Sequence, residues 1–223
     1  MEITENQKKE FIDIISKERL NSYCITSKDD FSILLENYIY NIKISETFYP
    51  ILSILEIGLR NRINNAIEAL IRPTWLLLEL KSPSLLLQNE HEILLKAAKK
   101  LSFKSKNLTK GALIAELSFG FWVNLCKKPY KTVFWDKKGF FDFVFPYFPP
   151  SNEMNRIKFI SSDLKNILQL RNRIFHHEII INHKLGVQNC YNIIEKVLFY
   201  ISKEYTDLLI NSSRFKEIIK QKP

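Results

Sequence analysis

Residues 48–71 carry the pattern that most constrains the fold, because apolar side chains recur there every three or four positions. The side chains in this series are Leu52, Leu55, Leu59, Ile63, Ala66 and Leu70. This spacing puts them on one face of an α-helix, and the proline after Arg72 cannot continue a helix. The segment predicts a long amphipathic helix whose apolar face is buried.

The same spacing recurs through most of the chain. We expect further helices over residues 6–20, 31–42, 85–101, 113–125, 151–171 and 187–210, with Ser151 as an N-cap. A many-stranded sandwich or barrel would need more turn residues than the 5 glycines and 8 prolines among 223 residues. The sequence therefore predicts an all-α helical bundle that forms a single domain over residues 1–223.

The helical periodicity fails between Lys127 and Pro150. The residues that interrupt it are Pro129, Gly139, Pro146, Pro149 and Pro150, and many aromatic residues lie among them. Because the segment is too apolar for a flexible linker, we expect an irregular connection with short helical pieces packed on the bundle.

The cysteines and the N-terminal segment indicate the compartment. Cys24, Cys126 and Cys190 are odd in number and widely spaced, so we expect buried thiols in a reducing cytoplasm and no disulfide framework. The first residues are polar and lack the basic start and apolar stretch of a signal peptide. No apolar run reaches the roughly 18 residues of a spanning helix, so we expect no membrane partner.

The chain is basic, with 33 lysines and arginines against 24 acids and a formal net charge of +9. Such a field favours a polyanion as partner. A run of lysines without an acid among them is a candidate RNA-binding surface: Lys96, Lys99, Lys100, Lys104, Lys106 and Lys110. A solvated helix end explains the run equally well. Phe103 within it could stack on a base, although a lone aromatic more often packs inward.

The segment that points to chemistry is RNRIFHHE, residues 171–178. Asn172 and His176 are four positions apart and share a helical face, whereas Arg171 is about 140° from His176 on an ideal helix. An arginine that holds a phosphate and a histidine that exchanges protons near neutral pH are the two parts needed to cleave RNA without a metal.

A metal or nucleotide cofactor is not expected. The set His176, His177, Glu178 and His183 does not have the spacing of an HExxH zinc site. The chain has neither a glycine-rich phosphate loop nor a GxSxG nucleophile elbow.

Three segments resemble the Abi-like branch of the HEPN superfamily, specifically the AbiD/AbiF-type abortive-infection proteins. RNRIFH at residues 171–176 is similar to the family's R-N-x-x-x-H ribonuclease motif. LEIGLRNRIN at residues 55–64 is similar to its LE-x-x-LRN-x-I helix, and LSFGFWV at residues 117–123 to its FG-x-W helix. The three occur in the family's order and span most of the chain.

The resemblance implies a HEPN-type bundle that acts as a homodimeric endoribonuclease without a cofactor. In that interpretation His176 moves the proton, Arg171 stabilises the phosphorane, and Asn172 orients His176 or contacts phosphate. His177 and Glu178 are supporting neighbours, His177 more as a positioning residue than as a second catalyst. Glu56 and Arg60 could line the cleft, with Glu56 orienting Arg171 or a histidine.

The biological role implied is that of a phage-defence or toxin–antitoxin toxin. It would cut an RNA such as tRNA, and an RNA or protein antitoxin would silence it.

Other interpretations remain open at this stage. Arg171 and His176 could only cap carbonyls and pair with Glu178, while Glu56 and Arg60 form an intrahelical ion pair. The chain could then be a non-catalytic RNA-binding module. It could also be a helical scaffold whose aromatic segment 134–148 binds a protein.

Overall fold

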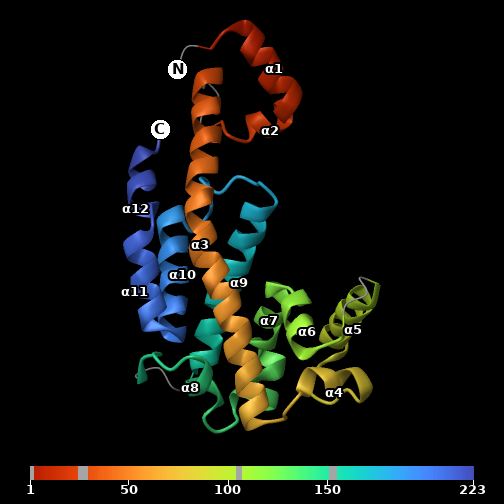
Figure 1. Ribbon diagram of the computed structural model, residues 1–223. Coiled ribbons are helices and arrows are strands. Elements are labelled where there is room, and N and C mark those ends of the chain that lie inside the picture. The colour runs from red at the N-terminus through yellow and green to blue at the C-terminus, as the bar shows by residue number, and fades with distance from the viewer. Residues whose placement is uncertain (1–2, 25–29, 104–106, 151–154) are drawn as a thin grey trace.

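The computed structural model describes residues 3–24, 30–103, 107–150 and 155–223. Every regular element within these ranges is helical, which confirms the all-α prediction (Figure 1). The longer elements are α1 (Glu5–Ile15), α2 (Lys17–Asn21), α3 (Phe31–Leu70), α4 (Trp75–Lys81), α5 (Gln88–Phe103), α6 (Lys110–Glu116), α7 (Phe119–Leu125), α8 (Phe140–Val144), α9 (Arg156–Phe175), α10 (Val187–Ile201), α11 (Lys203–Ser212) and α12 (Phe215–Ile218). None of the described helices is long and apolar enough to cross a membrane.

Helix α3 runs the length of the molecule, with α1 and α2 beside one end and α4 at the other (Figure 1). Its 40 residues join the two helices predicted over 31–42 and 48–71, so the expected break between them is wrong. The reason is that the buried face continues through Ile44 and Phe48. Pro50 lies inside the helix although it has no N–H to donate to the carbonyl of Glu46.

Three other predicted helices are each divided in two. Residues 6–20 form α1 and α2, residues 113–125 fall in α6 and α7, and residues 187–210 fall in α10 and α11. Serines stand at the divisions, since Ser16, Ser118 and Ser202 are the N-cap residues of α2, α7 and α11. Ser16 and Ser202 accept N–H groups of the new helix, a contact that restarts a helix in a new direction. The predicted cap Ser151 lies outside the described residues.

The connection after α7 is built from aromatic side chains, as predicted. It contains two short helical turns, η1 (Lys128–Tyr130) and η2 (Lys131–Trp135), followed by α8, which packs on α3. Trp135 stacks against Phe145 at 5.9 Å between ring centroids and meets Phe140 edge-on at 5.1 Å. These rings belong to the buried core, as do Phe119 and Trp122 of α7.

The cysteine prediction holds for two of the three thiols. Cys126 and Cys190 are buried, and burial raises the pKa of both. Cys24 is exposed, which contradicts the expectation, because it lies just beyond the turn that ends α2.

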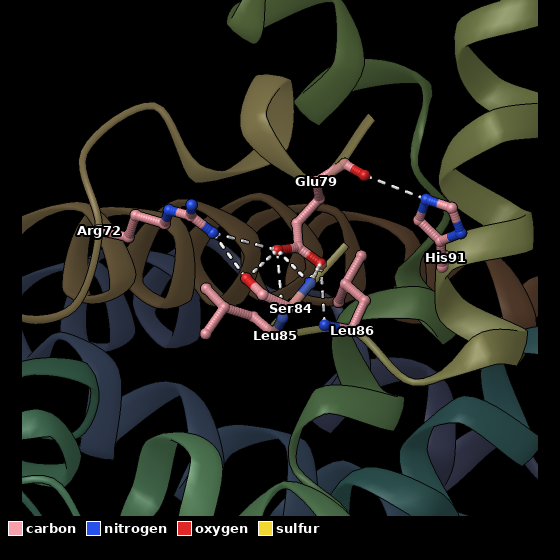
Figure 2. A network of polar contacts seen from close by, with 6 residues as sticks. All are labelled: Arg72, Glu79, Ser84, Leu85, Leu86 and His91. Carbon is pink, nitrogen blue, oxygen red and sulfur yellow. Dashed lines mark hydrogen bonds and ion pairs between the residues drawn. The ribbon is translucent and has the colours of Figure 1, made fainter. Parts of the chain in front are cut away.

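A buried carboxylate organises the loop between α4 and α5 (Figure 2). Glu79 is fully buried, and its two oxygens accept the backbone N–H groups of Ser84, Leu85 and Leu86 at 3.0–3.1 Å. Arg72 lies 3.7 Å from the same carboxylate, and the Ser84 hydroxyl donates to it at 3.0 Å. The side chain therefore supplies the acceptors that this glycine-free loop lacks in its own backbone.

The substitution Glu79→Gln is expected to destabilise the fold by about 2–4 kcal/mol, because an amide presents a donor where the carboxylate accepts several N–H groups. Urea unfolding followed by circular dichroism measures this loss. The exposed Glu10→Gln is the matched control and should stay within about 0.5 kcal/mol of wild type. Equal stability of the two variants would contradict the role assigned to Glu79.

Candidate functional site

The motif RNRIFH lies at the C-terminal end of α9, where the chain reverses in a Schellman turn. His176 is the C-cap residue, and His177 follows with a φ of +56°, in the left-handed region. The N–H of Glu178 donates to the carbonyl of Arg173 at 2.8 Å, and that of His177 donates to Ile174 at 3.0 Å. Glycine is the usual residue at the left-handed position, so a histidine there is strained.

A buried amide on α3 directs the chain after this turn. Asn41 is 4% exposed, and its Oδ1 accepts the N–H groups of Ile180 and Ile181 at 2.8 and 3.3 Å. Its Nδ2 lies within hydrogen-bond distance of the Glu178 carbonyl and the Tyr23 hydroxyl. Asn41 therefore ties α3, the residue after α2 and the motif together.

The N-terminal helices cover the other side of the turn. Arg19 of α2 donates a hydrogen bond to the carbonyl of His177, a residue 158 positions away. Sequence reasoning missed Arg19, and no local pattern could have indicated it, since the contact exists only after folding.

Together these elements form a pocket of about 240 Å³ lined mostly by polar residues, which we call the histidine pocket. Its lining residues are Arg19, Ser22, Tyr23, Arg173, His176, His177, Glu178 and Ile179. Both histidines are exposed, and Arg173 lies 3.5 Å from the carboxylate of Glu178. The structure thus brings the predicted residues His176, His177 and Glu178 together with two arginines.

The left-handed turn explains why both imidazoles line one pocket. The sequence argument separated His176 from His177 because successive helical side chains diverge by about 100°. That argument does not apply here, since α9 ends at Phe175 and His177 is outside the helix.

Arg171 lies apart from the lining of the histidine pocket. Its guanidinium is 3.5 Å from the carboxylate of Glu56 and 3.5 Å from the side-chain oxygen of Asn172, and it covers the ring of Phe175 at 4.3 Å. Glu56 therefore pairs with Arg171, while the intrahelical pair between Glu56 and Arg60 is not formed. The Nε atoms of Arg60 and Arg171 are buried and have no hydrogen-bond partner among the described residues.

Part of the lysine run is already paired with acidic side chains, which the local sequence does not indicate. Lys100 pairs with Glu116, and Lys110 lies 2.8 Å from Glu68, so acids from other helices neutralise two of its members. Lys96 and Lys99 are exposed.

Phe103, at the end of the same helix, is 78% exposed and so does not pack inward. Lys104 and Lys106 lie outside the described residues. In Figure 1, α5 stands far from the end of α9 that carries the histidine pocket.

His183 is separate from the other histidines of the motif region. It is 7% exposed, and its Nδ1 accepts the N–H of Leu185 and contacts the sulfur of Cys190, each at 3.3 Å. Burial lowers the pKa of His183, and the charges of Arg173 and Lys184 lower it further. Within the described ranges, no three histidine, cysteine or acidic side chains gather in a way that could hold a metal ion.

No protein-family model matches this chain, and no curated protein or solved structure is significantly similar to it.

The substitution His177→Gly is expected to stabilise the fold by about 1 kcal/mol, which raises the midpoint of thermal unfolding by about 2–4 °C, because glycine adopts the left-handed conformation without strain. His177→Ala is the control, since it removes the imidazole and keeps the Cβ. Stabilisation of both variants alike would contradict the argument from backbone strain.

Stability is expected to fall as the pH drops below about 6.5, because the unfolded chain then binds a proton at His183 that the folded protein disfavours. Above that pH the group is neutral in both states and contributes no slope. Urea unfolding of wild type and His183→Leu between pH 5 and 8 tests this, with a shallower slope below pH 6.5 expected for the variant. An unchanged slope would contradict it.

Proposed function

We propose that this chain is a metal-independent endoribonuclease of the HEPN type, which cleaves RNA by attack of a ribose 2′-OH on the adjacent phosphate. The observation that carries the proposal is the histidine pocket. It offers two exposed imidazoles, a guanidinium from Arg173 and a second guanidinium from Arg19. Acid–base catalysis of phosphate cleavage requires one group that takes a proton, one that gives a proton, and a cation for the phosphorane.

In the proposed reaction, one imidazole takes the proton from the 2′-OH as its oxygen bonds to phosphorus. The bond from phosphorus to the 5′ oxygen breaks, and the second imidazole gives its proton to that oxygen. The products are a 2′,3′-cyclic phosphate and a 5′-hydroxyl. DNA should be inert because it lacks the nucleophile.

We assign the two proton transfers to His176 and His177. The support is that both line one pocket of a single protomer, so the pair does not depend on a second subunit. Arg19 makes no ion pair within the described part of the chain, and its contact at the pocket is with a backbone carbonyl. An anionic phosphate is the partner that its charge favours.

The resemblance adds a homodimer in which each motif completes the site of the partner. Arg171 is the residue that this arrangement would use, because it is not part of the histidine pocket of its own protomer. Its contacts to Glu56 and Asn172 are both long at 3.5 Å, so its terminal N–H groups remain as donors for a phosphate.

The biological role that we propose follows the family. The chain would be a cytoplasmic toxin or phage-defence protein that cuts tRNA or another cellular RNA, kept silent by an RNA or protein antitoxin. The basic net charge of +9 supports RNA as the partner.

The test is cleavage of total cellular RNA by the purified protein in EDTA. We expect His176→Ala, His177→Ala and Arg171→Ala each to lower the rate by about 100-fold. The control Lys203→Ala removes an exposed charge on α11 and should keep wild-type activity. Wild-type products should carry cyclic phosphate ends.

Two outcomes would count against parts of this proposal. RNA binding without cleavage by the folded wild-type protein would favour the non-catalytic RNA-binding module. Loss of activity in His176→Ala with full activity in His177→Ala would assign the second proton transfer to the partner's motif.

A further inference from the structure

A second and larger hollow adjoins the histidine pocket. It has a volume of about 540 Å³ and shares the lining residues Arg19, Tyr23 and His177 with that pocket, so the two are neighbours. We call it the aromatic groove, because the rings of Tyr38, Tyr49 and Phe175 line it together with Ile42. Its volume lies in the range typical of sites for small ligands.

Two rings of the groove form a ledge that is open to solvent. Tyr49 is 59% exposed and Phe175 is 43% exposed, and their ring centroids are 6.1 Å apart with a tilt of 33°. Ile42 nearby is 52% exposed. Large apolar side chains with this much exposure, gathered around one hollow, indicate a surface that meets a ligand.

The ledge is held in place by charge. Arg171 covers the Phe175 ring at 4.3 Å from guanidinium carbon to ring centroid, and the Glu56 carboxylate lies 3.5 Å from the same guanidinium. A cation over the ring restricts its motion. The Phe175 ring thus contacts both the Arg171 guanidinium and the Tyr49 ring.

A ligand that matches the groove and the pocket together must carry a flat apolar part and an anionic part side by side. A nucleotide has this chemistry, because its base stacks on aromatic rings while its phosphate binds guanidinium and imidazole groups. The groove would take the base, and the histidine pocket, which begins at His177, would take the phosphate.

We infer that the aromatic groove is a subsite for one unpaired base of the RNA, next to the phosphate that is cut. This inference rests on the proposed function and adds to it the residues that select the base. A base paired in a duplex cannot enter the groove, so the subsite restricts cleavage to unpaired positions.

The shape of the groove favours a base over a second copy of this chain. A two-fold axis through the centre of the groove would set one hollow against the same hollow of the partner, which leaves both unfilled. Polar groups at the groove, Ser45 and Glu46, suit the hydrogen-bonding edge of a base better than a dry apolar interface.

The test uses a single-stranded 2′-O-methyl oligouridine that carries one 2-aminopurine, a fluorescent base whose emission falls when it stacks. The 2′-O-methyl groups remove the nucleophile, so binding is measured without cleavage. Wild type and Tyr49→Phe should bind and quench the emission. Tyr49→Ala should bind about 10-fold or more weakly and lose the quenching, since one stacked base contributes a factor of that order.

The control variant is Tyr205→Ala, which removes a ring of similar exposure, 57%, on α11 and should bind as wild type.

Equal affinity and quenching for Tyr49→Ala and wild type, with cleavage of natural RNA intact, would overturn the subsite and leave the proposed function standing. Absence of any RNA binding or cleavage by wild type would overturn the proposed function itself. Sedimentation of the same variants adds one outcome: dissociation of a dimer by Tyr49→Ala, without loss of quenching, would overturn the subsite in favour of a second copy.

Discussion

The candidate site depends on the side-chain amide of Asn41. The chain that leaves α9 passes along the N-terminal third of α3 with two buried N–H groups, those of Ile180 and Ile181, and Asn41 Oδ1 accepts both. Without that acceptor both N–H groups would be buried without a partner. This would destabilise the position of the segment, because a buried N–H without a partner costs about as much as a lost hydrogen bond. The same amide reaches Glu178 and Tyr23, so one side chain on the longest helix sets where His176, His177 and the residues after α2 meet.

The buried faces of the helices could be predicted from the sequence. The ends of the helices and the contacts between them could not. Ile160, Leu164 and Ile167 are buried on α9 as the periodicity indicates, because burial of a face is a local pattern. Whether a helix continues, as α3 does through Pro50, or ends, as α1 does at Ser16, depends on which neighbouring elements cover it. The periodicity of one segment carries no information about those neighbours. The motif residues were found as a local cluster, whereas the approach of Arg19 to His177 joins positions that only the fold brings together.

Buried acceptors replace the glycine turns that the chain lacks. Glu79 collects the N–H groups of the loop before α5, and Glu90 on α5 accepts the Tyr130 hydroxyl at 2.7 Å and the Asn124 amide at 3.0 Å. The pKa of Tyr130 is raised, first by burial and then by the neighbouring carboxylates, so this phenol stays a donor. Polar side chains that interrupt an apolar helix face thus mark the joints between helices in this protein, and Asn41 belongs to the same class.

Pro50 removes one backbone hydrogen bond from α3 and so marks the point at which the helix bends most easily. Since proline has no N–H, the turn that begins at Glu46 lacks one rung of the helical ladder, and bending of a long helix concentrates where a rung is missing. Asn41 and the groove residues Tyr38 and Ile42 lie on the N-terminal side of this point. Glu56, which contacts Arg171, lies on the C-terminal side. Bending of α3 at this point would therefore change the distance between its groove residues Tyr38 and Ile42 and the Glu56 carboxylate that contacts Arg171.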